Sequence, residues 1–240
     1  MNTALIFAGG SGRRMNCAAT PKQFLELDGK AIIVYTLEHF QNHPDIDSIA
    51  VVCIPDWIDH MQKLIERYRL TKVKWLVPGG STSQESTRNG LYAVAADQDP
   101  KDTVVLIHDG VRPLINAQTI TDNIESVKKY GNAITSVPAI ETIVTTEDGI
   151  QIDGVIDREH CRLARAPQSF YLADIIEMHE RSIADKYDKM IDSASLMMHY
   201  GVKLHLIDGP TENIKITTPS DFYIFRAIQE AKKSMQILGV

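Results

Sequence analysis

The chain has 240 residues, 44% of them hydrophobic and 23% charged, which is the balance of an ordinary globular protein. Its formal net charge of −6 at pH 7 disfavours a general nucleic-acid binder, because such proteins present a net basic face. The longest apolar run, residues 49–54, is far too short to span a bilayer, so we expect neither nucleic acid nor a membrane among its partners.

The cysteines and the N-terminus indicate the compartment. Cys17, Cys53 and Cys161 are an odd number at wide spacings, with no CxxC pair and no zinc pattern. This argues against a disulfide framework and for a reducing environment. The first residues lead directly into an apolar run, without the basic segment and cleavage site of a secretory signal. We therefore expect a cytoplasmic protein.

Apolar runs that favour β-strands alternate with segments of helical periodicity. The runs are residues 4–8, 49–54, 73–77, 104–108, 133–137 and 202–207. Between the first runs, Ile33, Leu37 and Phe40 recur at the spacing of one helix face, and a similar stripe begins at Ile58. Nearly all-apolar strands separated by helices indicate a mostly parallel sheet covered on both faces. The sequence therefore predicts a three-layer α/β fold, as a single domain over residues 1–240.

Residues 139–165 break this alternation. Two β-prone runs flank Asp148-Gly149, and Asp-Gly is a strong hairpin-turn signal. We expect an arm that projects from the domain. Its many Ile and Val residues favour a dimer contact, because a monomer seldom exposes such a patch. A hairpin folded back on its own sheet is the alternative, which the sequence leaves open.

The last segment begins with the signals of a helix start. Thr218 is placed as the N-cap, Pro219 as the first helical residue and Asp221 in the first turn. The pattern predicts a structural helix that reaches about Met235.

A glycine-rich loop with several cations follows the first predicted strand. The loop and its cations comprise Ala8, Gly9, Gly10, Gly12, Arg13, Arg14 and Lys22. Glycines let the backbone approach a ligand and direct successive N–H groups at an anion. Mobile cations around such a nest suit a triphosphate. A plain glycine-rich turn is the alternative, and the three cations favour phosphate binding.

Two commoner phosphate motifs do not fit this loop. A dinucleotide-binding GxGxxG would need a third glycine where Met15 stands, and a P-loop would need Gly-Lys-Ser/Thr after four spacers. This argues against a NAD(P)-dependent oxidoreductase, one rival class. A non-catalytic nucleotide sensor is a second rival. Such a sensor would keep the loop but would have no need for the lysine and carboxylate described next.

Asp109 follows a predicted strand at the end where open α/β sheets place their ligand crevice. A carboxylate there, facing a phosphate loop, is a natural ligand for Mg²⁺. Because Gly110 follows, a turn or cap role is the alternative for Asp109. We predict Mg²⁺ as the cofactor and assign the preceding His108 to structure. Lys215 lies in an alternating run, residues 213–217, which predicts a strand. A solvated lysine on an edge strand is its ordinary interpretation.

These motifs, in their order, resemble those of the small cytidylyltransferases, a family that includes ribitol-5-phosphate and methylerythritol-phosphate enzymes. The matching segments are residues 8–15, 21–27, 79–80, 108–113, 157–158, 166–170 and 212–217. They extend over nearly the whole chain. The resemblance implies a Rossmann-like nucleotidyltransferase domain that takes CTP and a polyol phosphate, and a homodimer in which the arm reaches into the partner subunit.

The resemblance also implies a role for each matching residue. It assigns Arg14, Lys22 and Lys215 to the charge on the triphosphate, Asp109 to the metal, and Ala8, Gly9, Gly10, Gly12, Gly80, Ser81, Ser86, Arg112, Thr142 and Arg158 to substrate binding. Arg112 has the alternative of holding Asp109, and Arg158 that of an arm salt bridge. Asp192 fits a helix N-cap as well as a polyol contact. Ser81 and Ser83 depart from the family pattern, which often has an acidic residue and an arginine there.

The reaction implied needs no enzyme nucleophile. An oxygen of the acceptor phosphate attacks the α-phosphorus of CTP in line and pyrophosphate leaves, while the protein supplies positioning and countercharge. Asp56-Trp57 looks closer to the alditol-phosphate branch, and Asp157-Arg158 looks closer to the methylerythritol branch. We favour ribitol 5-phosphate or a related alditol phosphate as the acceptor, with 2-C-methyl-D-erythritol 4-phosphate as the alternative.

Overall fold

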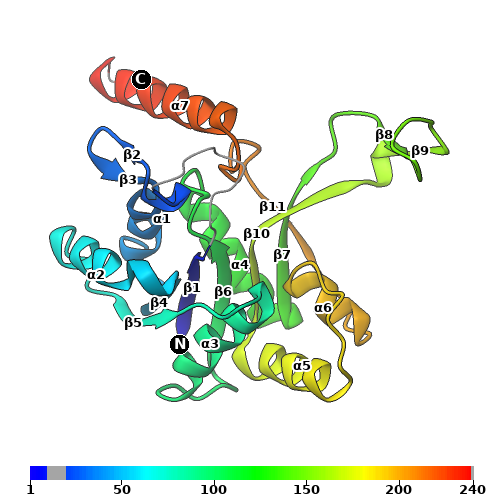
Figure 1. Cartoon of the computed structure of the whole chain (residues 1–240), viewed down its shortest axis with the longest axis horizontal. Coiled ribbons are helices and arrows are strands. Elements are labelled where there is room, and N and C mark those ends of the chain that lie inside the picture. The colour runs from blue at the N-terminus through cyan, green and yellow to red at the C-terminus, as the bar shows by residue number, and fades with distance from the viewer. Residues whose placement is uncertain (10–19, 239–240) are drawn as a thin grey trace.

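A seven-stranded sheet runs through the middle of the molecule in the computed structural model, which describes residues 1–9 and 20–238 (Figure 1). Its strands are β1 (Asn2–Ala8), β4 (Ser48–Cys53), β5 (Val73–Pro78), β6 (Val104–Asp109), β7 (Asn132–Pro138), β10 (Arg162–Tyr171) and β11 (Leu206–Asp208). The strand order is β11-β7-β10-β6-β1-β4-β5, and β10 alone runs antiparallel to its neighbours. The predicted mostly parallel sheet is confirmed.

Helices cover both faces of this sheet, as predicted. On one face lie α1 (Ile32–Gln41), α2 (Ile58–Arg67) and α4 (Ala117–Tyr130); on the other lie α3 (Ser83–Ala95), α5 (Leu172–Ala184) and α6 (Ser193–His199). Alternate residues of β1 belong to the two hydrophobic cores, one on each face of the sheet. Ala4 and Ile6 pack toward α1, and Leu5 packs toward α3. Each fully buried Leu or Ile contributes about 1.5–3 kcal/mol. This alternation produces the three layers.

Two parts of the main sheet differ from the prediction. The run at 202–207 forms a strand only from Leu206, because the preceding backbone is hydrogen-bonded elsewhere: Val202 N–H donates to Met197 O, and His205 N–H donates to the Asn132 side chain. Strand β10, within and beyond the arm segment, was not predicted. It lies between β7 and β6 and turns a polar end toward the site described below.

The arm is a hairpin, as predicted. Strands β8 (Ile143–Thr145) and β9 (Gly154–Ile156) pair antiparallel, and the turn residue Gly149 adopts a positive φ of 74°. Figure 1 shows the hairpin standing away from the main sheet, beyond the ends of β7 and β10. The alternative of a hairpin folded back on its own sheet is therefore wrong. Ile150, Ile152 and Val155 are 87%, 67% and 68% exposed.

The smaller elements and the last helix surround one end of the sheet. They are the strands β2 (Glu26–Leu27) and β3 (Lys30–Ala31), the 3-10 helices Lys22–Phe24, Pro55–Trp57 and Arg158–His160, and α7 (Pro219–Leu238). Helix α7 starts where predicted and extends three residues beyond Met235. Thr218 is the N-cap, as predicted: its hydroxyl accepts a hydrogen bond from Asp221 N–H at 3.4 Å, and the Asp221 carboxylate accepts from the N–H groups of Thr217 and Thr218. Within the described residues, none of the helices is both long and apolar enough to cross a bilayer.

Candidate active site

A cavity of about 640 Å³ opens at the carboxyl ends of β1 and β6, the position expected for ligands of open α/β sheets. Its lining comes from widely separated parts of the chain: the end of β1, the start of α3, the end of β6, strand β10 and the segment before α7. Lys22, Arg112, Arg165 and Lys215 contribute positive charge to the wall, whereas Asp109 and Asp192 contribute the carboxylates. This excess of positive charge suits an anionic ligand.

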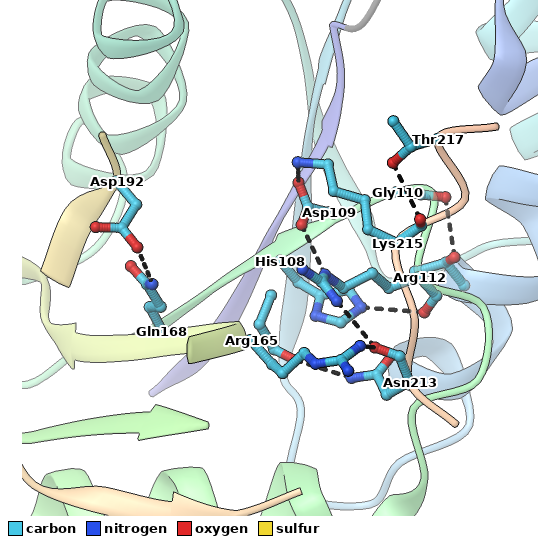
Figure 2. Close-up of polar contacts among 12 residues, drawn as sticks. His108, Asp109, Gly110, Arg112, Arg165, Gln168, Asp192, Asn213, Lys215 and Thr217 are labelled. Atoms are coloured by element: carbon cyan, nitrogen blue, oxygen red, sulfur yellow. Dashed lines mark hydrogen bonds and ion pairs between the residues drawn. The ribbon is translucent and has the colours of Figure 1, made fainter. Parts of the chain in front are cut away.

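Asp109 is the centre of an ion-pair cluster. Arg112 Nε donates to its Oδ2 at 2.8 Å, and Lys215 Nζ donates to its Oδ1 at 2.7 Å (Figure 2). Burial alone would raise the pKa of Asp109, but the charges and hydrogen bonds of Lys215 and Arg112 outweigh it and hold the pKa well below its usual range. Asp109 therefore stays ionised and holds both cations at the cavity. Both alternatives for Arg112 remain open, since it contacts Asp109 and also lines the cavity.

The segment that carries Lys215 is extended but is not a strand, so that prediction is wrong. Among the described residues its backbone forms no ladder with a strand: Ile216 N–H donates to Val111 O at 2.9 Å, and the Arg112 guanidinium donates to Asn213 O at 2.9 Å. Ile216 is fully buried, in a cluster that includes Phe225 of α7. Packing on one side and polar contacts on the other present Lys215 to the cavity.

His108 lies beneath this cluster. It is buried, and its Nε2 is 3.2 Å from Arg112 O, while its ring packs against Phe40. Burial lowers the pKa of His108 to about 3. A neutral, enclosed imidazole that braces the Arg112 backbone agrees with the structural role expected for it.

The start of α3 forms a second wall. Gly80, Ser81 and Ser86 all line the cavity, as the resemblance implies for a base pocket. Gly80 N–H donates to Ser86 Oγ at 3.0 Å, and Ser81 donates through N–H and hydroxyl to Glu85 at 2.7 and 2.6 Å. A Cβ at Gly80 would lie 2.2 Å from Glu85 Cγ, so only glycine fits this turn. Glu85 thereby holds the backbone that faces the cavity.

Only part of the glycine-rich loop can be placed. Gly9 and Lys22 line the cavity, and the buried Ala8 accepts a 2.6 Å hydrogen bond from Gln23 Nε2 through its carbonyl. Gly10, Gly12 and Arg14 lie outside the described residues, and so do Arg13 and Cys17. Lys22 and Lys215, 193 positions apart in the sequence, therefore line the same cavity.

Thr142 and Arg158 are not brought to this cavity. Both lie exposed on the arm, and Arg158 donates to Ile140 O at 3.1 Å. Within the part of the chain that the structure describes, the arm salt bridge weighed for Arg158 does not form. A contact of these two residues with a substrate therefore stays a prediction.

Several lining residues were not assigned a role from the sequence or were left undecided, among them Arg165, Gln168, His179 and Asp192. Asp192 caps α6 through a capping box and also accepts a 2.7 Å hydrogen bond from Gln168 Nε2. His179 is buried, and among the described residues neither ring nitrogen has a hydrogen-bond partner; burial lowers its pKa to about 4. Gln168 belongs to the matching segment 166–170, which was the available signal. Arg165 immediately precedes that segment.

Comparisons with known proteins agree with this geometry. The family model described as IspD, 2-C-methyl-D-erythritol 4-phosphate cytidylyltransferase, matches residues 2–231. A ribitol-5-phosphate cytidylyltransferase of Vibrio parahaemolyticus is 51% identical over 239 residues, with both chains fully covered. A 2-C-methyl-D-erythritol 4-phosphate cytidylyltransferase of Clostridium botulinum is 37% identical, covering 95% of this chain and 97% of that one. The crystal structure of 4-diphosphocytidyl-2C-methyl-D-erythritol synthase from Anaerococcus prevotii superposes with a TM-score of 0.81 at 28% identity, covering 95% and 96% of the two chains. The chain belongs to the IspD family of cytidylyltransferases, which are nucleotidyltransferase enzymes.

Proposed function

We propose that the enzyme transfers CMP from CTP to D-ribitol 5-phosphate and releases pyrophosphate. The observation that carries this choice of acceptor is the 51% identity, over the full length of both chains, to a ribitol-5-phosphate cytidylyltransferase. The identity to a methylerythritol-phosphate enzyme is 37%. The latter activity is the second candidate, since the family model carries its name.

The cavity supports this proposal because one wall suits a cytosine ring and another suits a triphosphate. Gly80, Ser81 and Ser86 offer a backbone turn and hydroxyls suited to the edge of a cytosine ring. The triphosphate would extend from there past Gly9 and Lys22 toward Lys215. Backbone N–H groups and lysines are the usual partners of phosphate oxygens.

The chemistry is a displacement at phosphorus. An acceptor phosphate oxygen forms a bond to the α-phosphorus, the bond from that phosphorus to the bridging β-phosphate oxygen breaks, and pyrophosphate departs with the electron pair. Lys215 and Arg112 supply countercharge to the α-phosphate as negative charge accumulates on it. In the structure Lys215 is paired with Asp109. On binding, a phosphate oxygen takes over the Lys215 hydrogen bond.

Mg²⁺ fits the residues present. It prefers one or two carboxylates together with substrate phosphate oxygens, and Asp109 is an ionised carboxylate at the phosphate end of the cavity. Among the described residues there is no cluster of three or more His, Cys, Asp or Glu side chains that would form a complete cage. Asp109 would hold the ion, which would neutralise phosphate charge and help the leaving group depart. Arg112 would keep the carboxylate oriented.

The acceptor phosphate would also contact Thr142 and Arg158 of a second subunit. The arm that carries them projects from the main body and exposes apolar side chains, which favours burial against another copy of the chain (Figure 1). A homodimer would thereby complete each site with residues from the partner arm.

Pyrophosphate release tests the proposed function. Purified enzyme, CTP and Mg²⁺ are mixed in turn with D-ribitol 5-phosphate, 2-C-methyl-D-erythritol 4-phosphate and D-erythritol 4-phosphate. We expect D-ribitol 5-phosphate to give the highest kcat/KM, with ATP, GTP and UTP as nucleotide controls. A preference for the methylerythritol acceptor would replace the first candidate by the second. No release with any polyol phosphate would refute both.

A further inference from the structure

Strand β10 brings a second guanidinium group to the cavity beside Arg112. Arg165 Nη1 donates to Asn213 O at 3.0 Å, and Arg112 Nη1 donates to the same carbonyl at 2.9 Å. Figure 2 shows the two side chains converging on Asn213 from different elements. Arg165 is half-buried and lines the cavity.

The charge of Arg165 is not balanced locally. Within the described part of the chain no carboxylate oxygen lies within 4.0 Å of its guanidinium, whereas Arg112 is paired with Asp109. Asp109 is moreover shared with Lys215. Burial and the nearby charge of Arg112 lower the pKa of Arg165. Arg165 is thus partly desolvated beside a second arginine, and among the described residues its hydrogen-bond partner is a neutral carbonyl. Such a guanidinium is stabilised when an anion binds between the two arginines.

The sheet order indicates which anion this is. Along the order β10-β6-β1-β4-β5, the proposed nucleotide residues follow β5 and β1, and Asp109 ends β6. Arg165, on β10, lies on the opposite side of Asp109 from them. An in-line displacement brings the attacking oxygen from the side opposite the leaving pyrophosphate. The β10 side is therefore the side of the acceptor.

We propose that Arg165 binds the phosphate monoester of the acceptor from within the same subunit, as a residue that determines acceptor affinity. This inference rests on the proposed function, because it requires a phosphorylated acceptor. An arginine fork matches two phosphate oxygens, a geometry that lysine does not reproduce. The competing role is purely structural, in which Arg165 only holds the segment 213–217 through Asn213 O.

Steady-state kinetics of Arg165→Met and Arg165→Lys separate these roles. We expect the methionine variant to raise the KM for the acceptor about 10- to 100-fold, because a charge-assisted pair of hydrogen bonds is lost. The KM for CTP and the thermal midpoint should stay close to wild type. The lysine variant should recover only part of the acceptor affinity.

Arg162→Met is the matched control. Arg162 lies on the same strand but pairs with Asp208 and donates to Ser136 Oγ, outside the cavity lining. Its kinetic constants should equal those of wild type. An unchanged acceptor KM in Arg165→Met would overturn the inference. So would a parallel rise in the KM for CTP with a lowered thermal midpoint, since that pattern indicates displacement of Lys215.

Calorimetric titration with inorganic phosphate, without CTP, distinguishes failure of this inference from failure of the proposed function. If wild type turns over no polyol phosphate, the proposed function fails, yet the guanidinium pair still predicts an anion site. Wild type should then bind phosphate at least about tenfold more tightly than Arg165→Met. Equal binding by the two proteins would contradict the inference.

Discussion

At the scale of single residues, the site depends on Asp109 holding two cations in place. Its two oxygens are occupied by different partners, Lys215 and Arg112, and each partner also lines the cavity. The Lys215 side chain is half exposed, so its ion pair with Asp109 adds little to the stability of the protein. Its placement is better explained by catalysis than by stability.

Replacing Lys215 by methionine tests this assignment. We expect kcat to fall by a factor of about 10²–10³, the usual effect of removing one group that stabilises transition-state charge. The urea midpoint should fall only modestly, because Asp109 keeps Arg112 as an ion-pair partner and the methionine keeps the apolar stem. Lys203→Met, at an exposed lysine outside the cavity, is the control. A Lys215→Met enzyme with near-normal kcat would remove Lys215 from the mechanism.

Two buried histidines predict a dependence of stability on pH. Burial lowers the pKa of His108 to about 3 and that of His179 to about 4, from the ordinary value of 6.5. The unfolded chain binds these protons near pH 6.5, whereas the folded chain binds them only near the lowered values. The contribution of these two neutral histidines to the free energy of unfolding is therefore fully present above pH 6.5. It falls as the pH drops toward 4, by at most about 1.4 kcal/mol per pH unit for each histidine.

Urea denaturation between pH 7 and pH 5 measures this dependence. His179→Gln should show a smaller loss of unfolding free energy over that range than wild type, because one of the two groups no longer takes up a proton on unfolding. His60→Gln, at an exposed histidine, should follow wild type. The account of buried neutral histidines is wrong if wild type and His179→Gln lose stability equally.

At the scale of elements, the sequence predicted the strands and helices with regular apolar patterns and missed those without them. The buried parallel strands and the helices α1 and α2 have apolar patterns fixed by a two-sided sheet, and these were found. Strand β10 was missed because its first half carries polar residues, Arg162 and Arg165 among them. The segment 213–217 was called a strand because its alternation is genuine, yet its hydrogen bonds go to a loop and a side chain.

The same reasoning explains which site residues were found. Asp109 could be placed at the cavity because it follows a predicted strand, and Gly80 could be placed through the family resemblance. The positions of Arg165 and His179 at the cavity depend on which strand lies beside β6 and which helix faces α3. No local sequence pattern specifies these neighbours. Gly10, Gly12 and Arg14 remain predictions, as do the roles of Thr142 and Arg158.

The arm is the element whose role can be tested most simply. Replacing Ile152 and Val155 by glutamate places charge on exposed apolar positions, and we expect sedimentation equilibrium to report a monomer where wild type is a dimer. Ile183→Glu, on an exposed face of α5, should remain a dimer. A wild-type monomer, or a double variant that stays dimeric, would contradict the arm interface.

At the scale of the whole molecule, a site shared between subunits predicts complementation. Asp109→Asn and Arg158→Gln should each be nearly inactive alone. Mixed and re-associated, they should recover about a quarter of wild-type activity, because half of the dimers are mixed and each has one intact site. Failure to recover activity from mixed dimers would indicate that Arg158 does not act across the interface.

We expect the nucleotide phosphates to bind where distant segments of the chain meet. Lys22 follows β1, Asp109 ends β6 and Lys215 precedes α7, yet all three line one cavity. The sheet brings the strand ends together, and α7 packs over Ile216 and fixes the last segment. The triphosphate is therefore expected to lie against all three residues.

A crystal structure of the enzyme with CTP and Mg²⁺, in the absence of acceptor, tests this position of the triphosphate. We expect Lys215 Nζ to leave Asp109 and to lie about 3 Å from an α-phosphate oxygen, with Lys22 beside the triphosphate and the base against Gly80 and Ser86. CTP bound elsewhere, with Lys215 still paired to Asp109, would contradict the account.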